Sequence, residues 1–141
     1  MILVEKLLIL IDDYVDNNDN SIAFISMGQL NYLSALKYVD VVIGNSSSGL
    51  LEAPSFKIVT IDIGDRQKGR IKAASVISCL PTQDSISGAL DKAFSKDFQC
   101  IINEVENPYG DGGASKNIVE LIHSFPMDGI LKKEFYNLNN N

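Results

Sequence analysis

Apolar side chains recur every three or four residues at the start of the chain, at Leu3, Leu7, Leu10, Ile11 and Tyr14. This spacing predicts an amphipathic helix over Ile2–Val15, which the polar run Asp16–Asn20 brings to an end. Glu5 and Lys6 interrupt the segment, and it is shorter than the ~20 apolar residues that a membrane span needs. We therefore interpret it as a helix of a globular fold rather than a targeting or membrane segment.

Short apolar runs follow, several of them rich in β-branched residues. They predict four strands, at Ile22–Ile25, Val41–Ile43, Lys57–Ile61 and Ala74–Cys79. Helical patterns separate and follow them: one with Leu30, Leu33, Leu36 and Tyr38, one starting among Ser46–Ser48, and further ones over Pro81–Ala93, Asp97–Val105 and Ala114–Phe125. Pro54 is expected to kink or end the serine-led helix near Ala53, and Thr82 to cap the next helix. The last residues, Asn137–Asn141, are expected to fray.

Continuous apolar strands that alternate with helices are typical of a parallel sheet covered on both faces. The predicted fold class is therefore α/β and Rossmann-like. Because the chain begins with a helix and shows only four strands, we interpret residues 1–141 as one incomplete domain with a tail over 126–141. An incomplete sheet and an apolar first helix predict association, either as a homo-oligomer or with a missing N-terminal domain.

The composition narrows the classes of function. The 141 residues are 45% hydrophobic and carry 18 acidic against 12 basic side chains, a net charge of −6. This profile excludes a disordered chain and argues against nucleic acid or anionic membrane as a partner. Cys79 and Cys100 are too few for a disulfide scaffold, and His123 is the single histidine. We expect a cytoplasmic setting, no metal site and no cofactor.

A serine-rich loop follows the second predicted strand, within Gly44–Pro54. The carboxyl ends of parallel strands are where ligands bind in such sheets, and a helix start with small residues suits a phosphate. Glu52, four residues after Ser48, offers a carboxylate that accepts two hydroxyl donors, as a ribose presents. The alternatives are that Ser46–Ser48 only caps the helix and that Glu52 is a solvated surface residue.

A basic loop follows the third predicted strand, within Ile63–Arg70. It should meet the serine loop at the same sheet edge and bring Arg66 over the Ser46–Ser47 turn. An arginine fork fits a diphosphate. The alternative is a solvated turn in which Asp65 pairs with one of the bases.

Three motifs carry a family resemblance: Gly44–Phe56, Ile63–Arg70 and Asn107–Gly112. Over roughly Ser21–Phe125 the chain resembles the C-terminal part of the hydrolysing UDP-N-acetylglucosamine 2-epimerases of bacterial sialic-acid and capsule biosynthesis. Such enzymes are similar to GT-B glycosyltransferases, with two Rossmann-like domains and the UDP-sugar in the cleft between them. The resemblance implies that this chain is most of the second domain.

The resemblance also implies roles for particular residues. Ser46 and Ser47 match the serines that hold the UDP diphosphate, and Glu52 matches the acid that binds the ribose hydroxyls. Arg66 matches an arginine that contacts UDP. Met27 matches a position whose main chain reads the uracil edge. The implied reaction converts UDP-N-acetylglucosamine and water to N-acetylmannosamine and UDP.

The family's acid/base groups come mainly from regions that this sequence does not contain, so no catalytic residue is assigned. His123 sits at no matching position and is interpreted as a surface or helix-end residue. We therefore expect a UDP-binding domain that is inactive alone. The alternatives are a non-catalytic nucleotide-binding or assembly module, and a fragment of another GT-B glycosyltransferase. The tyrosine and glycines of Tyr109–Gly113 are interpreted as a turn before the last helix.

Overall fold

The computed structural model describes residues 2–132, and the side chains of residues 5–132. The chain divides into two compact units, Met1–Tyr109 and Gly110–Asn141. The division falls directly before Gly110–Gly113, where three of the four residues are glycine. Folding of the whole chain as one incomplete domain stays a prediction. The expected fraying of Asn137–Asn141 lies outside the described residues.

The first unit holds most of the secondary structure. Its elements are α1 (Ile2–Asp16), α2 (Gly28–Ala35), the 3-10 helix η1 (Leu36–Tyr38), β1 (Val41–Gly44), α3 (Ser48–Leu51), the 3-10 helix η2 (Ala53–Phe56), β2 (Val59–Ile63), β3 (Val76–Cys79), α4 (Gln83–Ala93) and α5 (Lys96–Asn103). The second unit contains α6 (Ala114–Ser124).

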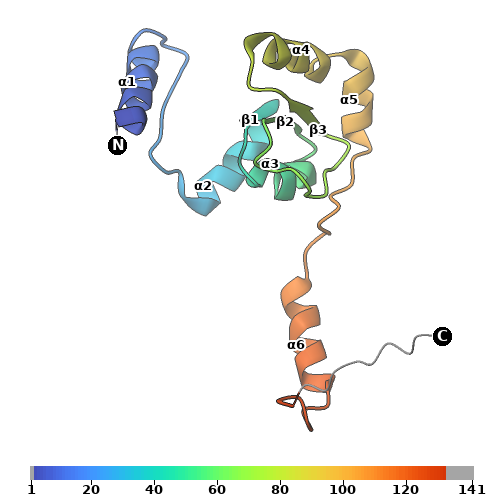
Figure 1. The fold of residues 1–141 in the computed structure, drawn as a ribbon. Helices are drawn as coiled ribbons and strands as arrows, with labels where there is room; N and C mark the ends of the chain where they lie inside the picture. The colour runs from blue at the N-terminus through green and yellow to red at the C-terminus, as the bar shows by residue number, and fades with distance from the viewer. Residues whose placement is uncertain (1, 133–141) are drawn as a thin grey trace, which may run out of the picture. The chain divides into compact units, whose positions relative to one another are not determined.

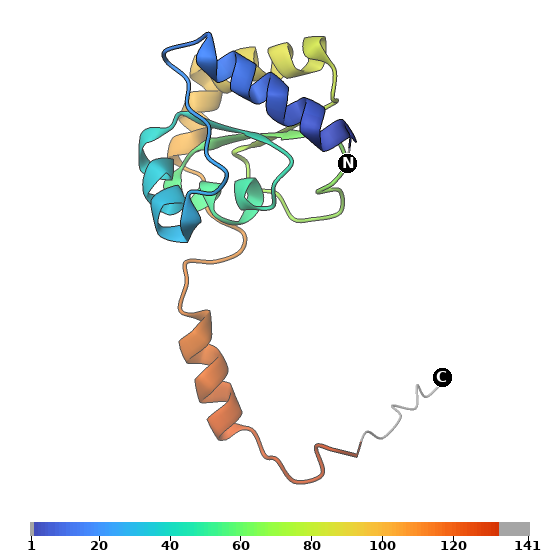
Figure 2. The same ribbon diagram turned by 90° about the vertical axis from the view of Figure 1, so that its left-hand side faces the viewer.

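The three strands form a parallel sheet in the order β1-β2-β3. Ile43 of β1 lies opposite Ile61 of β2, which in turn lies opposite Ile77 of β3. Figures 1 and 2 show α3 on one face of this sheet and α4 and α5 on the other. The predicted α/β class, with helices on both faces, is confirmed.

One predicted strand is wrong. Residues 21–27 have no strand structure, and Ile22 and Ile25 are 73% and 108% exposed. An apolar run becomes a strand only when a neighbouring strand completes its ladder of hydrogen bonds, and Ile22–Ile25 pairs with none of the three described strands. The described sheet therefore has three strands rather than four.

The start of β2 is also shifted from the prediction, which placed it at Lys57. Lys57 has a left-handed backbone (φ 55°) and ends η2, and the Ile58 N–H donates to the Ala53 carbonyl (3.4 Å). Pro54 therefore does break the serine-led helix as predicted, but the turn that follows it delays the strand to Val59. The start of β3 is delayed in the same way, because the Val76 N–H donates to the Ala73 carbonyl (3.1 Å).

The core lies between the sheet and the α4–α5 pair. It is formed by Val59, Ile61, Ile77, Ala89, Ala93, Phe98 and Ile102. The predicted cap of α4 is confirmed, since the Thr82 side chain accepts from the Ser85 N–H (3.4 Å). Ser95 caps α5 in the same way, accepting from the Phe98 N–H (3.3 Å).

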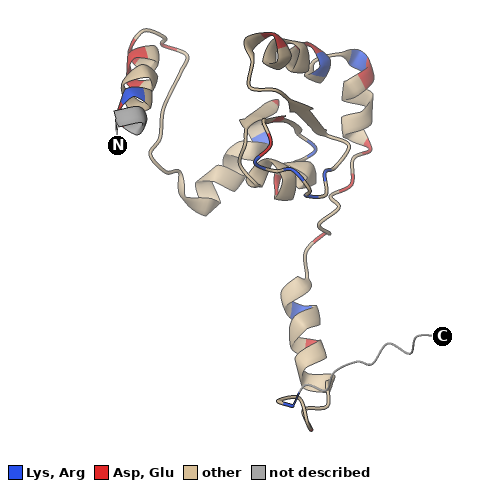
Figure 3. Ribbon diagram, viewed as in Figure 1, with Lys and Arg blue, Asp and Glu red and all other residues tan. Residues whose placement is uncertain are grey.

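The first and last helices are present as predicted, over Ile2–Asp16 and Ala114–Ser124. In Figure 3 α6 is mostly uncharged, and its apolar residues Ile118, Val119, Leu121 and Ile122 are each more than half exposed. His123 is exposed in its last turn, which confirms the interpretation of a surface histidine. Over residues 2–132 none of the helices combines the length and apolar character needed to cross a membrane; the cytoplasmic setting stays a prediction.

Candidate functional site

The loops that follow β1 and β2 meet at one edge of the sheet, as predicted. The link is made at Asn45, the residue directly after β1. Its backbone carbonyl accepts from Nε2 of Gln67 (2.7 Å), and its side-chain Oδ1 accepts from Nη1 of Arg66 (3.3 Å). The serine loop and the basic loop are therefore joined in one structure, with Arg66 beside the residue that precedes Ser46.

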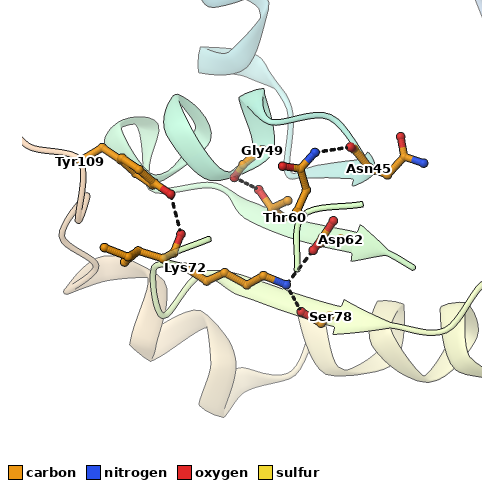
Figure 4. Close-up of polar contacts among 9 residues, drawn as sticks. Asn45, Gly49, Thr60, Asp62, Lys72, Ser78 and Tyr109 are labelled. Carbon is orange, nitrogen blue, oxygen red and sulfur yellow. Dashed lines mark hydrogen bonds and ion pairs between the residues drawn. The ribbon is translucent and has the colours of Figure 1, made fainter. Parts of the chain in front are cut away.

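A close contact between α3 and β2 holds the serine loop against the sheet. Thr60 Oγ1 donates to the buried Gly49 carbonyl (2.7 Å), as Figure 4 shows. A Cβ added to Gly49 would lie 2.5 Å from Cγ2 of Thr60, so a larger residue would push α3 off the sheet. The small residue at this position is thus required by the contact with the sheet.

An open cavity of about 540 Å³ lies where the segment before α2 faces the start of α3. Its wall is formed by Phe24, Ile25, Ser26, Met27, Gly28, Gln29, Tyr32, Ser46, Ser48 and Glu52. Three of the five predicted site residues, Met27, Ser46 and Glu52, therefore line one cavity although they come from two segments of the chain. Ser47 and Arg66 do not belong to this wall.

The capping alternative for the serines finds partial support. Ser47 occupies the N-cap of α3, but its side chain makes no capping bond. Ser46 Oγ accepts a long bond from the Ser48 N–H (3.4 Å), and the Ser48 hydroxyl is hydrogen-bonded to the Tyr32 hydroxyl. Because α3 has only four residues, its dipole is much weaker than that of the longer helix that the sequence predicted. A bound anion would depend on hydroxyls and on Arg66 more than on the helix.

The alternative for the basic loop was an ion pair of Asp65. Within residues 5–132 the ion pairs are Lys72–Asp62 and Lys116–Glu120, so Asp65 is paired with none of the neighbouring bases. Arg66 is exposed. Among the described residues its guanidinium makes only the 3.3 Å bond to an amide oxygen, so it keeps donors for a ligand.

An ion pair between the buried Asp62 and the partly exposed Lys72 went unrecognised in the sequence. Lys72 Nζ lies 2.7 Å from Oδ2 of Asp62 and donates to Oγ of Ser78 (2.6 Å), as drawn in Figure 4. Asp62 is 1% exposed. Burial, and then the charge of Asp62, raise the pKa of the Cys79 thiol above its ordinary value. The available signal was an acidic residue inside the β-branched run of β2, which is rare unless it is paired.

The third motif, Asn107–Gly112, is hydrogen-bonded to the end of α3 and to η2. Asn107 Nδ2 donates to the Leu51 carbonyl (2.8 Å) and to Ser55 Oγ (2.7 Å), and its Oδ1 accepts from the Tyr109 N–H (2.9 Å). Tyr109 lies in a turn, and Asp111 and Gly112 lie in a bend. The interpretation of Tyr109–Gly113 as a turn before the last helix is therefore confirmed. This motif therefore supports the end of α3 and η2.

Metal-binding side chains do not gather anywhere in the described part of the chain, where no three His, Cys, Asp or Glu residues come together. Glu52 is half-buried on the cavity wall. The chemistry that the site offers is therefore hydrogen bonding from hydroxyls and backbone, one carboxylate and one arginine.

Comparison with known proteins identifies the family. Residues 4–123 match the family described as UDP-N-acetylglucosamine 2-epimerase. The chain belongs to this family. The polysialic acid biosynthesis protein P7 of Escherichia coli is 42% identical over 101 residues, which are 72% of this chain and 26% of that protein. This membership disfavours the alternative of a fragment from another glycosyltransferase.

Two other relatives are named as hydrolysing 2-epimerases. The GDP/UDP-N,N'-diacetylbacillosamine 2-epimerase of Campylobacter jejuni is 36% identical over 127 residues, 86% of this chain and 32% of that protein. The UDP-N,N'-diacetylbacillosamine 2-epimerase of Legionella pneumophila is 32% identical over 117 residues, 83% of this chain and 30% of that protein. The chain thus matches between about a quarter and a third of the length of these relatives.

Proposed function

We propose that this chain is the UDP-binding part of a hydrolysing UDP-N-acetylglucosamine 2-epimerase. The observation that carries the proposal is the meeting of three segments at one sheet edge: the Met27 turn, the serine loop with Glu52, and the Arg66 loop. Family membership supports it, because the relatives named as 2-epimerases act on nucleotide-linked sugars.

Each group has a role that fits its chemistry. The main chain at Met27 pairs with the uracil edge, and the Glu52 carboxylate accepts the two ribose hydroxyls. Ser46 and Ser47 donate hydroxyls to the diphosphate. Arg66 supplies its full positive charge through a forked guanidinium. The nucleotide would span from the cavity wall toward Asn45.

In the whole enzyme we propose the reaction of UDP-N-acetylglucosamine with water to give N-acetylmannosamine and UDP. This requires one group to remove a proton from the sugar and another to return one. Within the described residues, Glu52 is the one carboxylate on the cavity wall, and no histidine lies there. We propose that the chain alone binds UDP without turnover, the acid/base groups being supplied by the remaining length of the enzyme.

Calorimetric titration of UDP into the purified chain and its Arg66→Ala variant tests the proposal. A charge-assisted hydrogen bond contributes about 1.5–3 kcal/mol, so the variant should bind UDP roughly tenfold to a hundredfold more weakly. Uridine lacks the phosphates and should bind both proteins alike. Lys68→Ala is the control in the same loop and should lose less, because a flexible ammonium lacks the fork.

Equal binding of UDP by Arg66→Ala and the parent chain would contradict the assignment of this loop. Release of N-acetylmannosamine from UDP-N-acetylglucosamine by the 141-residue chain, well above a buffer control, would contradict the proposed inactivity.

We also propose that the chain associates, with itself or with the remaining part of the enzyme. The exposed apolar residues of α6 support this, since contiguous apolar surface is usually covered in a soluble assembly. Sedimentation at micromolar concentration should show a species larger than 15.4 kDa. A compact monomer would exclude self-association.

A further inference from the structure

Gln67 is a buried residue between two exposed charged neighbours. It is 3% exposed, whereas Arg66 and Lys68 on either side face solvent. Burying an amide costs free energy unless it is hydrogen-bonded, and here Nε2 donates to the Asn45 carbonyl at 2.7 Å. The side chain of Gln67 is therefore hydrogen-bonded to the serine loop rather than to water or to its own loop.

This bond joins two residues that are 22 positions apart in the sequence. A backbone carbonyl can only accept, so the Gln67 amide has to present Nε2 to it, which fixes the orientation of the side chain. Within the described residues, Oε1 of Gln67 is buried without a partner. The amide of Gln67 is consequently held by its Nε2 bond. Figure 4 labels Asn45, whose carbonyl accepts this bond.

Arg66 by contrast is weakly held. Its bond to Oδ1 of Asn45 is 3.3 Å long and exposed, and an exposed contact of this kind contributes little. A long arginine side chain loses rotamer freedom when it binds, and that loss weakens binding unless the backbone beneath it is already in place. The residue next to Arg66 that fixes this backbone is Gln67.

We propose that Gln67 is a positioning residue. It holds the Arg66 loop in a fixed position relative to the serine loop, so that the Arg66 guanidinium faces the diphosphate. The proposal rests on the proposed function of the site. Gln67 itself touches no nucleotide; it acts through Arg66.

The test compares Gln67→Met, which keeps the volume but removes the hydrogen bond, with Gln99→Met, a control that removes the same kind of bond at a more exposed residue. Gln99 Nε2 makes the same kind of bond at the same length, 2.7 Å to the Ala93 carbonyl, but belongs to α5. Losing one such bond should weaken UDP binding roughly threefold to tenfold in Gln67→Met and leave it unchanged in Gln99→Met. Binding of uridine should be unchanged in both.

A double-mutant cycle separates positioning from a general effect on the fold. In the Arg66→Ala background, Gln67→Met should cause no further loss of UDP affinity, because the group that it positions is gone. A further loss as large as in the parent background would overturn the proposal, as would equal UDP binding by Gln67→Met and the parent. If Gln67→Met fails to fold by circular dichroism, Gln67→Asn, which keeps the amide one methylene short, takes its place.

A readout without nucleotide distinguishes this inference from the proposed function. Hydrogen exchange of the peptide covering residues 64–70 should be faster in Gln67→Met than in the parent and in Gln99→Met. If the parent chain binds no UDP, the proposed function fails; faster exchange then still supports loop positioning by Gln67, and unchanged exchange overturns it.

Discussion

The two faces of β2 are equally buried but are held in different ways. Val59 and Ile61 point to the α4–α5 side and are 1% and 0% exposed. Thr60 and Asp62 point to the other side and are 3% and 1% exposed. The first pair packs among apolar side chains, whereas the second pair is hydrogen-bonded, to the Gly49 carbonyl and to Lys72.

The apolar face of β2 mainly stabilises the sheet, whereas the polar face mainly fixes the position of α3. Apolar burial scales with the area removed from water and has no preferred direction, so the α4–α5 face stabilises the sheet without fixing any loop to a fraction of an ångström. Hydrogen bonds and a buried ion pair depend on distance and angle. The face of β2 that carries them is the one on which α3 is seated, and α3 carries Glu52 at its end. Three predictions test this difference between the two faces.

The largest effect is expected from Ile61→Ala on the apolar face. Removing a fully buried isoleucine side chain should lower the free energy of unfolding by about 3–4 kcal/mol. Ile43→Ala is the matched control, since Ile43 lies opposite Ile61 in β1 but is 50% exposed; it should cost about 1 kcal/mol. Urea denaturation followed by circular dichroism measures both. Similar losses in the two variants would mean that this face is not the core.

A smaller loss is expected from Lys72→Met on the polar face, because it leaves the Asp62 carboxylate buried without its partner. Removing one partner of a buried pair costs about 3–5 kcal/mol; since the Lys72 side chain is 27% exposed, we expect about 2–3 kcal/mol. Adding Asp62→Asn should restore more than half of the loss.

Lys116→Met is the control for this experiment. Lys116 and Glu120 form an exposed pair at 3.8 Å, so the variant should change the free energy of unfolding by less than about 0.5 kcal/mol. If Lys72→Met is as mild as Lys116→Met in urea denaturation, the Asp62–Lys72 pair does not hold this face together.

The smallest effect concerns the two thiols. Partial burial and the charge of Asp62 raise the pKa of Cys79, so less of it is thiolate at pH 8, whereas Cys100 is exposed on α5. Cys79 should react with iodoacetamide more slowly, by roughly threefold or more, and the difference should narrow as the pH rises. Peptide mapping by mass spectrometry over a time course gives both rates. Equal rates at pH 8 would place Cys79 outside the apolar face.

Features that depend on neighbouring residues were predictable from the sequence. Thr82 caps α4 because its hydroxyl reaches an N–H three residues later, and Pro54 ends the serine-led helix because its ring and missing N–H act locally. The alternation of apolar runs and helical patterns was enough for the α/β class. The prediction of a strand at Ile22–Ile25 was wrong because it used the apolar run alone. A strand also needs a partner strand elsewhere in the chain.

The sequence by itself therefore determined the fold class, the local helix signals, and the two loops that carry four of the five predicted site residues. Only the tertiary structure decided that Gly49 must be small beneath Thr60, that Asp62 is paired with Lys72, and that Gln67 is tied to Asn45. These contacts join residues between 10 and 22 positions apart. No local pattern encodes them, because each exists only where folding brings two separate segments to the same edge or face of the sheet.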